Sequence, residues 1–249
     1  MPTLLLSPRN DPDSRALGEA AHETGWEVLR MPTWGTFPPR AADAYYGESL
    51  YGRLMQQEGK LRGTLADPPE DWLPRLPWSL RRRAVHLLEV SDVAARWGHH
   101  PLFCKPVDEK TFRAGLYDDP SHLPFASIDS TEKVLVASPV VWSVEYRVFL
   151  LRGKAVASSR YARFGELDAA VDEECPEAGE VAEEAFVAAP GLPEGIVVDV
   201  GLIEGRWAVV EANQSWGSGL YDCDPRAALP AIAAGLTTTR SEATGSPPE

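Results

Sequence analysis

Two glycine turns in the second half of the chain, each between apolar runs, most constrain its fold. They are Arg152-Gly153 and Glu204-Gly205, and the runs beside them are 145–151, 155–159, 196–201 and 207–212. A short turn between two strand-like runs is typical of a β-hairpin. Further strand-like runs at 102–104 and 133–137, with an amphipathic helical spacing at 176–188, indicate an α+β domain with a largely antiparallel sheet.

The first part of the chain predicts an α/β arrangement instead. An apolar strand at 4–6 is followed by Asp11, a helix N-cap, and by Pro12 at the first helical position. Gly25 marks the end of that helix, and the run 26–29 is a second strand. A strand, a helix and a strand in this order are typical of a βαβ unit with a parallel strand pair.

A proline-rich segment at 67–77 interrupts regular structure after this unit. Beyond it, Ser79 is expected to cap a long helix that ends at Gly98, because apolar residues recur there on one helical face. The three arginines at 81–83 would mostly lie on the other face. There they are either solvated or face a substrate.

These patterns divide the chain into three parts. Residues 1–100 are expected to form an N-terminal α/β domain with its connecting helix, and 101–236 a second, α+β domain. From 237 to 249, Ser, Thr, Gly and Pro dominate and no apolar periodicity survives, so this tail is expected to be disordered.

The charge balance excludes several classes of protein. With 37 acidic and 24 basic residues, the net charge of -13 argues against a chain that mainly binds nucleic-acid backbone or an anionic membrane. No apolar run approaches the roughly 18 residues of a membrane span, and no signal peptide is recognisable, which favours a cytoplasmic protein. The three cysteines lack any C-x-x-C spacing, so neither a disulfide framework nor a zinc knuckle is indicated.

Three oxygen-bearing side chains interrupt the second apolar hairpin. Glu211 and Asn213 are two residues apart and therefore share a face of their strand. Whether Asp199 joins them depends on the turn. A three-residue loop at 204–206 would place Asp199 opposite Glu211, whereas a two-residue turn would place Val198 there and separate the two acids.

Two carboxylates and an amide that converge would suit Mg²⁺, which prefers oxygen ligands and shares its shell with phosphate oxygens. They suit zinc poorly. The alternative is that the acids lie at a solvated end of the sheet. The valines around Asp199 and Glu211 favour the cation site, because a buried carboxylate without a partner is costly.

Basic residues stand where they would reach an anionic ligand. Lys105 follows the strand at 102–104 and Lys110 lies in the next turn; both suit nucleotide phosphates, or else extend along the surface. Arg147 and Arg160 lie on the strands of the first hairpin. They suit a phosphoryl group or carboxylate, or else an ion pair with Glu145. No P-loop or G-x-G-x-x-G is present.

The order of these features resembles the ATP-grasp superfamily, in particular its small phage and bacterial branch typified by two arginines and a lysine. The features are Lys105, the strand before Ser138, Glu145-Tyr146-Arg147, Arg160, Asp199 and Glu211-x-Asn213. The likeness runs from about residue 102 to 224, and the preceding βαβ region resembles the superfamily's N-terminal domain. The segment 107–131 is shorter than its counterpart in the superfamily, so its helical subdomain would be reduced.

The resemblance implies a role for each matching position. The nucleotide contacts would be Lys105, Lys110, Val136, Ser138, Val140 and Glu145, with the segment 135–141 as the hinge that meets the adenine. Arg147 and Arg160 would hold the γ-phosphate and the acyl phosphate. Asp199, Glu211 and Asn213 would bind Mg²⁺. The loop at 214–219 would meet the acceptor substrate through Ser215, Trp216 and Gly217.

The resemblance therefore implies an ATP-dependent carboxylate-amine ligase that forms an amide or peptide bond through an acyl phosphate, with ATP and Mg²⁺ as cofactors. The expected partners are a small-molecule carboxylate and an amine, or a peptide, with no membrane and no nucleic acid; a homodimer stays open. Two alternatives remain. They are a kinase that phosphorylates a small molecule at the same nucleotide site, and a non-catalytic nucleotide-binding module.

Overall fold

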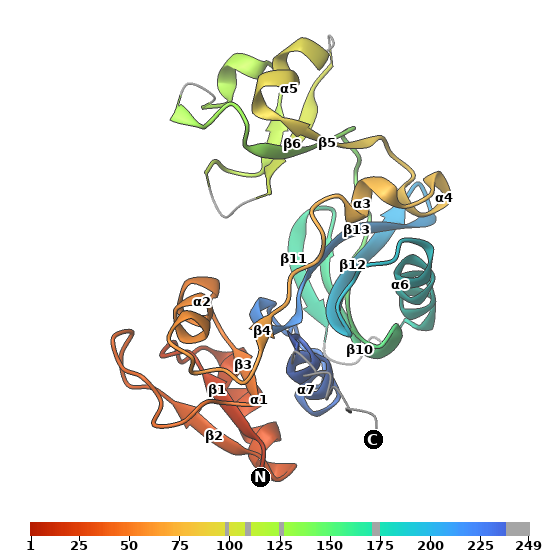
Figure 1. The fold of residues 1–249 in the computed structure, drawn as a ribbon. Helices are drawn as coiled ribbons and strands as arrows, with labels where there is room; N and C mark the ends of the chain where they lie inside the picture. The colour runs from red at the N-terminus through yellow and green to blue at the C-terminus, as the bar shows by residue number, and fades with distance from the viewer. Residues whose placement is uncertain (98–99, 108–110, 125–126, 171–174, 238–249) are drawn as a thin grey trace, which may run out of the picture.

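A computed structural model of the chain describes residues 1–97, 100–107, 111–124, 127–170 and 175–237. Three larger sheets organise these residues (Figure 1): an N-terminal parallel sheet, a central antiparallel sheet and a smaller antiparallel sheet at the opposite end from the N-terminus. The predicted combination of an α/β part with a mainly antiparallel α+β part is confirmed. None of the helices in the described ranges is long and apolar enough to cross a membrane.

The predicted βαβ unit is present at the N-terminus. β1 (Thr3–Leu6) pairs in parallel with β2 (Glu27–Arg30), and α1 (Pro12–Glu23) connects them. The Asp11 carboxylate caps α1 by accepting a hydrogen bond of 2.8 Å from the Ser14 amide. β3 (Ala44–Tyr46) pairs with the other side of β1, and α2 (Ser49–Gln57) follows it. The parallel sheet therefore has three strands, in the order β2-β1-β3.

The long helix expected at 79–98 is wrong. A one-turn helix, α3 (Trp72–Arg75), precedes the region, which contains a second one-turn helix, α4 (Trp78–Arg81), the strand β5 (Val85–Glu89) and the helix α5 (Val90–Arg96). Arg82 ends α4 in the left-handed conformation with a φ of 50°. β5 then pairs along its whole length with a strand about fifty residues away, so tertiary pairing overrides the local helical spacing. Residue 98 lies outside the described residues.

β5 belongs to the four-stranded small sheet. Its strand order is β5-β8-β6-β7, all antiparallel, with β6 (Leu102–Pro106), β7 (Gly115–Tyr117) and β8 (Lys133–Ala137). Helix α5 covers one face, where residues from β6, β8 and α5 form a separate small core. This sheet draws on residues before 101; the division at 100 and 101 stays a prediction.

The central sheet has the strand order β11-β10-β9-β12-β13. Its strands are β9 (Glu145–Leu151), β10 (Lys154–Arg163), β11 (Glu166–Ala170), β12 (Gly195–Ile203) and β13 (Arg206–Gln214). The four predicted hairpin strands are confirmed: β9 has the predicted range, and β10, β12 and β13 are longer than predicted. The strand β11 was not predicted. All neighbouring strands in this sheet pair antiparallel.

Helices cover the two faces of the central sheet differently. α6 (Pro176–Ala188), at its predicted position, packs its alanines against the face that carries Val148 and Val198. α7 (Pro225–Ala234), which was not predicted, packs with the N-terminal sheet against the face that carries Phe149 and Val197. Between Gln214 and α7 lies the 3-10 turn η3 (Ser215–Gly217). The short strand β14 (Leu236–Thr237) pairs back with β4 (Thr64–Leu65).

A close approach between β12 and α7 yields a stability prediction. A Cβ at Gly195 would lie 1.9 Å from the Ala231 carbonyl oxygen and 2.6 Å from the Gly235 amide nitrogen. We therefore expect Gly195→Ala to lower the free energy of unfolding by about 1–3 kcal/mol, because α7 must shift. Chemical denaturation measures this change. Gly115→Ala is the matched control, since nothing lies within 4 Å of that position, and an equal loss in both variants would contradict the prediction.

Candidate functional site

The hairpin of β12 and β13 places Asp199 opposite Glu211 by a route that neither predicted loop contained. Ile203 pairs with Arg206, so Glu204 and Gly205 form a two-residue turn with φ values of 50° and 74°. A regular ladder from this turn would set Val210 opposite Asp199.

Instead, the register shifts by one residue between Val200 and Asp199, so that Val209 pairs with Val200 and Glu211 with Asp199. Val210 is the extra residue of a β-bulge. Of the two alternatives, the two-residue turn is therefore present, and the bulge brings Asp199 and Glu211 together despite it.

The three predicted metal ligands lie in contact. The Asn213 amide nitrogen donates to Glu211 Oε1 at 2.8 Å and lies 3.3 Å from Asp199 Oδ2. The Asp199 side chain is 1% exposed, whereas that of Glu211 is 31% exposed. Two carboxylates with an amide fit a hard cation such as Mg²⁺ once the amide turns its oxygen toward them. Across the described residues, no cluster of three or more His, Cys, Asp or Glu side chains offers another metal site.

Lys105 reaches this cluster from the small sheet. Its ammonium lies 2.5 Å from Glu211 Oε2, so the ion pair spans β6 and β13. Desolvation alone would raise the pKa of Glu211, but Lys105 and the Asn213 amide outweigh it and hold the pKa below its ordinary value. The carboxylate is therefore ionised at neutral pH.

Arg147 holds the other carboxylate in a buried bidentate pair. Its Nε and Nη2 donate to Asp199 Oδ1 and Oδ2 at 2.9 and 2.7 Å across β9 and β12. Nη1 donates to the Gly219 carbonyl at 3.0 Å, and the guanidinium lies 4.6 Å from the ring centre of Tyr221. Desolvation would lower the pKa of Arg147, but the charge of Asp199 outweighs it and raises the pKa above its ordinary value.

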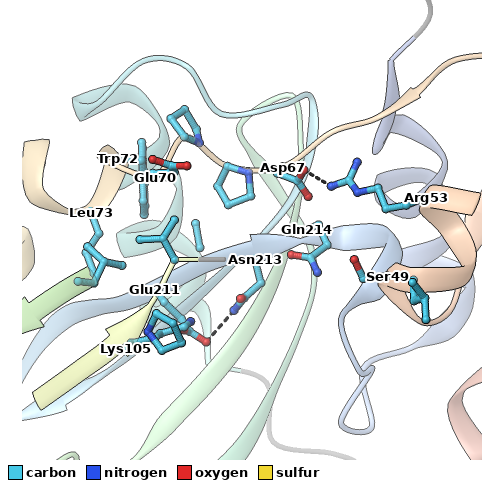
Figure 2. Close-up of a pocket in the computed structure, with 17 residues that line it drawn as sticks. Ser49, Arg53, Asp67, Glu70, Trp72, Leu73, Lys105, Glu211, Asn213 and Gln214 are labelled. Carbon is cyan, nitrogen blue, oxygen red and sulfur yellow. Dashed lines mark hydrogen bonds and ion pairs between the residues drawn. The ribbon is translucent and has the colours of Figure 1, made fainter. Parts of the chain in front are cut away.

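A cleft of about 470 Å³ runs beside this cluster along the outer edge of β13. Figure 2 shows Lys105, Glu211 and Asn213 at one end of it and Arg53 with Asp67 at the other. The cleft therefore lies between the small sheet and the N-terminal part of the chain, and residues from both line it.

This arrangement matches a known family. Residues 80–231, more than half of the chain, match the model of an ATP-grasp domain, family 2 of the clade typified by two arginines and a lysine. The chain belongs to this ATP-grasp family. No curated protein sequence matches the chain significantly.

Solved structures share this ATP-grasp fold at low sequence identity. The RimK domain protein ATP-grasp from Sphaerobacter thermophilus DSM 20745 is 15% identical, with a TM-score of 0.58 and coverage of 95% of this chain and 99% of that chain. N5-carboxyaminoimidazole synthase from Aspergillus clavatus, in complex with ADP and 5-aminoimidazole ribonucleotide, is 12% identical, with a TM-score of 0.57 and coverage of 93% and 77%. D-alanine--D-alanine ligase from Bacillus anthracis is 10% identical, with a TM-score of 0.55 and coverage of 94% and 97%.

Within the predicted hinge, residues 135–141, one residue lines the cleft. Leu135 lines the cleft, and residues after β8 connect the small sheet to the central one. The Val136 side chain lies in the core of the small sheet and its strand is paired on both sides, and its predicted nucleotide contact stays a prediction. The Ser138 amide donates to the Ala84 carbonyl, while Val140 follows in the connection. The nucleotide roles of Ser138 and Val140 stay predictions.

Two predicted substrate contacts are core residues instead. Trp216 is fully buried against Tyr45, and its indole nitrogen donates to the Ala66 carbonyl at 2.8 Å. Ser215 is also fully buried and bonds to the Gly195 and Ala231 carbonyls. Neither side chain can act as a lid or wall of the cleft in this arrangement. Gly217 is exposed, and its substrate role stays a prediction.

Of the remaining predicted residues, Glu145 lies on β9 and Arg160 lies on β10. The Glu145 carboxylate accepts a hydrogen bond of 2.8 Å from the Tyr161 hydroxyl, and desolvation raises its pKa. Arg160 contacts β11, where its Nε donates to the Asp168 carbonyl at 3.1 Å. Lys110 lies outside the described residues. The roles of Glu145, Arg160 and Lys110 stay predictions.

Sequence reasoning missed several residues of the site. Arg53 and Asp67 line the cleft from the N-terminal part, and Tyr161 and Tyr221 stack beside Arg147. No local motif marks them, because each comes from a different element. Arg83, the last of the three arginines at 81–83, donates a hydrogen bond to a β13 carbonyl more than a hundred residues away, which no local pattern predicts.

The buried pair of Arg147 and Asp199 yields a prediction. Removing only the guanidinium in Arg147→Met leaves the Asp199 carboxylate without its partner, so we expect a loss of about 3–5 kcal/mol in the free energy of unfolding. Arg147→Met with Asp199→Asn should cost less than the sum of the two single changes. A double-mutant cycle by chemical denaturation measures this coupling.

An exposed ion pair provides the matched cycle. Arg152 and Glu194 lie 2.9 Å apart with side chains 74% and 61% exposed. Coupling between them should be below about 1 kcal/mol, since solvent screens the charges. Equal coupling in the two cycles would refute the view that burial makes the Arg147 pair strong.

Proposed function

We propose that the chain is an ATP-dependent carboxylate-amine ligase that forms an amide bond through an acyl phosphate. The observation that carries this proposal is the convergence of Lys105 with Asp199, Glu211 and Asn213 at one cleft. Membership of the ATP-grasp family supports it, as do similar folds that include a D-alanine--D-alanine ligase. A small metabolite, an amino acid or a peptide would supply the acid and the amine.

Asp199, Glu211 and Asn213 would hold Mg²⁺. When bound there, the ion would neutralise phosphate charge and orient the triphosphate. The amide of Asn213 donates to both carboxylates in this structure, so it must rotate to present its oxygen. Tight pairing of Asp199 with Arg147 keeps that carboxylate aimed at the shared position.

Lys105 would contact the nucleotide phosphates. Its side chain is 35% exposed, stands at the cleft and pairs with a carboxylate from the opposite sheet. When Glu211 turns to a cation, the ammonium is free to donate to phosphate oxygens. One short movement therefore links metal and nucleotide binding.

An apolar face of the small sheet supports a site for the base. Phe103 is two residues before Lys105 and so shares its face, and Leu116 is the cross-strand partner of Phe103. Both side chains are unusually exposed for their type, at 39% and 57%, and Val141 beyond β8 is 72% exposed. A planar base packed on this face would cover apolar surface that otherwise meets water.

Catalysis in this arrangement needs positioning and charge neutralisation more than covalent help. The acid substrate would accept the γ-phosphoryl group, and the amine would then displace phosphate from the acyl phosphate. Arg147, with Arg160, would offset negative charge on the transferred group. The exposed turn at Gly217 would face the acceptor.

The decisive experiment asks what becomes of the phosphate. We expect ATP with Mg²⁺ and a matching acid and amine to yield ADP and free phosphate in equal amounts, together with an amide product. Screening amino acids and peptides for ADP release, followed by mass spectrometry, measures this outcome. Phosphate retained on the product would establish a kinase, and nucleotide binding without turnover for any substrate would establish a binding module.

Glu211 and Lys105 should separate metal from nucleotide effects. We expect Glu211→Gln to reduce Mg²⁺-dependent turnover by at least roughly 100-fold, because the cation loses a charged ligand. Lys105→Met should mainly raise the KM for ATP, by roughly 10- to 100-fold for a lost charged hydrogen bond. Steady-state kinetics over Mg²⁺ and ATP concentrations measure both.

Glu194→Gln is the control for these kinetics, because this exposed glutamate pairs with Arg152 away from the cleft. Circular dichroism should show the same fold in all variants. Wild-type kinetics in both Glu211→Gln and Lys105→Met would rule out this assignment of the site.

A further inference from the structure

The bulge at Val210 lies on the edge strand of the central sheet. β13 pairs with β12 on one side only, so the backbone groups along its outer edge need other partners. In a regular strand, successive carbonyls point to opposite edges. At a bulge, two successive carbonyls can point the same way.

The two terminal nitrogens of the Arg83 guanidinium bind the two carbonyls at the bulge. Its Nη1 donates to the Val209 carbonyl and its Nη2 to the Val210 carbonyl, each at 2.8 Å. The planar fork thus spans two consecutive carbonyls on one edge. Arg82 makes a different contact, in which its Nε donates at 2.8 Å to the single Trp207 carbonyl, before the bulge.

The Arg83 side chain is held in place from other sides. The residue is 7% exposed, and its guanidinium lies 4.9 Å from the ring centre of Trp142 in the connection between β8 and β9. Nη1 also lies 3.1 Å from the Arg81 carbonyl. Burial lowers the pKa of Arg83 to about 10, so the group is still charged at neutral pH.

We propose that Arg83 is a positioning residue that fixes the bulge at Val210 and thereby sets Glu211 and Asn213 opposite Asp199. The inference rests on the proposed Mg²⁺ site. Without the bulge, the two-residue turn of Glu204 and Gly205 pairs Asp199 with Val210, and the carboxylates separate. Arg83 therefore acts on the metal ligands through the backbone of β13, without touching them.

The test compares Arg83→Met with Arg82→Met. Mn²⁺ binding to the full chain in the presence of ADP is followed by electron paramagnetic resonance, which requires no turnover. We expect Arg83→Met to weaken Mn²⁺ binding by about 10- to 100-fold, as for outer contacts that orient metal ligands. Arg82→Met should change it less than about twofold, since that contact lies outside the bulge.

Two further readouts separate positioning from general damage. In the metal-free chain, the amides of residues 209–213 should exchange hydrogen faster in Arg83→Met, while those of β9 stay protected. Arg83→Lys keeps the charge but has no fork. It should stay closer to Arg83→Met than to wild type, and it replaces Arg83→Met in the comparison if that variant does not fold.

Deletion of Val210 provides a suppressor. The deletion gives a regular ladder in which Glu211 still lies opposite Asp199, so Mn²⁺ affinity in Arg83→Met should recover to within about threefold of wild type. No recovery, equal loss in Arg82→Met, or unchanged binding in Arg83→Met each overturns the role of Arg83. Absence of Mn²⁺ and ADP binding in the wild-type chain would instead overturn the proposed function.

Discussion

The register between β12 and β13 is the constraint on which the site depends. Side chains on a strand alternate between faces, so a slip of one residue would turn Glu211 away from Asp199. The two-residue turn alone gives the wrong register, and one extra residue corrects it. Arg83, between α4 and β5, donates hydrogen bonds to the two carbonyls that the bulge leaves on the outer edge of β13. Fold and chemistry are therefore linked through backbone pairing.

Charge compensation explains how two carboxylates can share this small space. Asp199 pairs with Arg147 and Glu211 with Lys105, so the four side chains sum to no net charge. A lone triphosphate would leave the cluster strongly negative, and a divalent cation bound with it would cancel part of that charge. Because uncompensated charge is costly away from water, we expect the cation to strengthen nucleotide binding.

The sequence contained the local elements and the spacing of the cluster. Asp11 with Pro12, and the apolar spacing at 176–188, are short-range signals, and they produced α1 and α6 where expected. The helix predicted at 79–98 was wrong because pairing with β8 makes residues 85–89 a strand, although their apolar residues recur at helical spacing. Asp199, Glu211 and Asn213 were recognisable from residue type and periodicity. The means by which these three residues meet was not recognisable, since the bulge depends on Arg83, far away in the chain.

The distribution of cores has a mechanical consequence. The N-terminal and central sheets share one buried cluster, in which Leu4 and Leu6 pack with Phe149 and Val197, and β14 closes back on β4. The small sheet has its own core and meets the central one mainly where β5 begins and β8 ends. The N-terminal and central sheets should consequently move as one rigid unit. The small sheet should rotate relative to that unit about the start of β5 and the end of β8, and this rotation would carry Lys105 toward or away from Glu211.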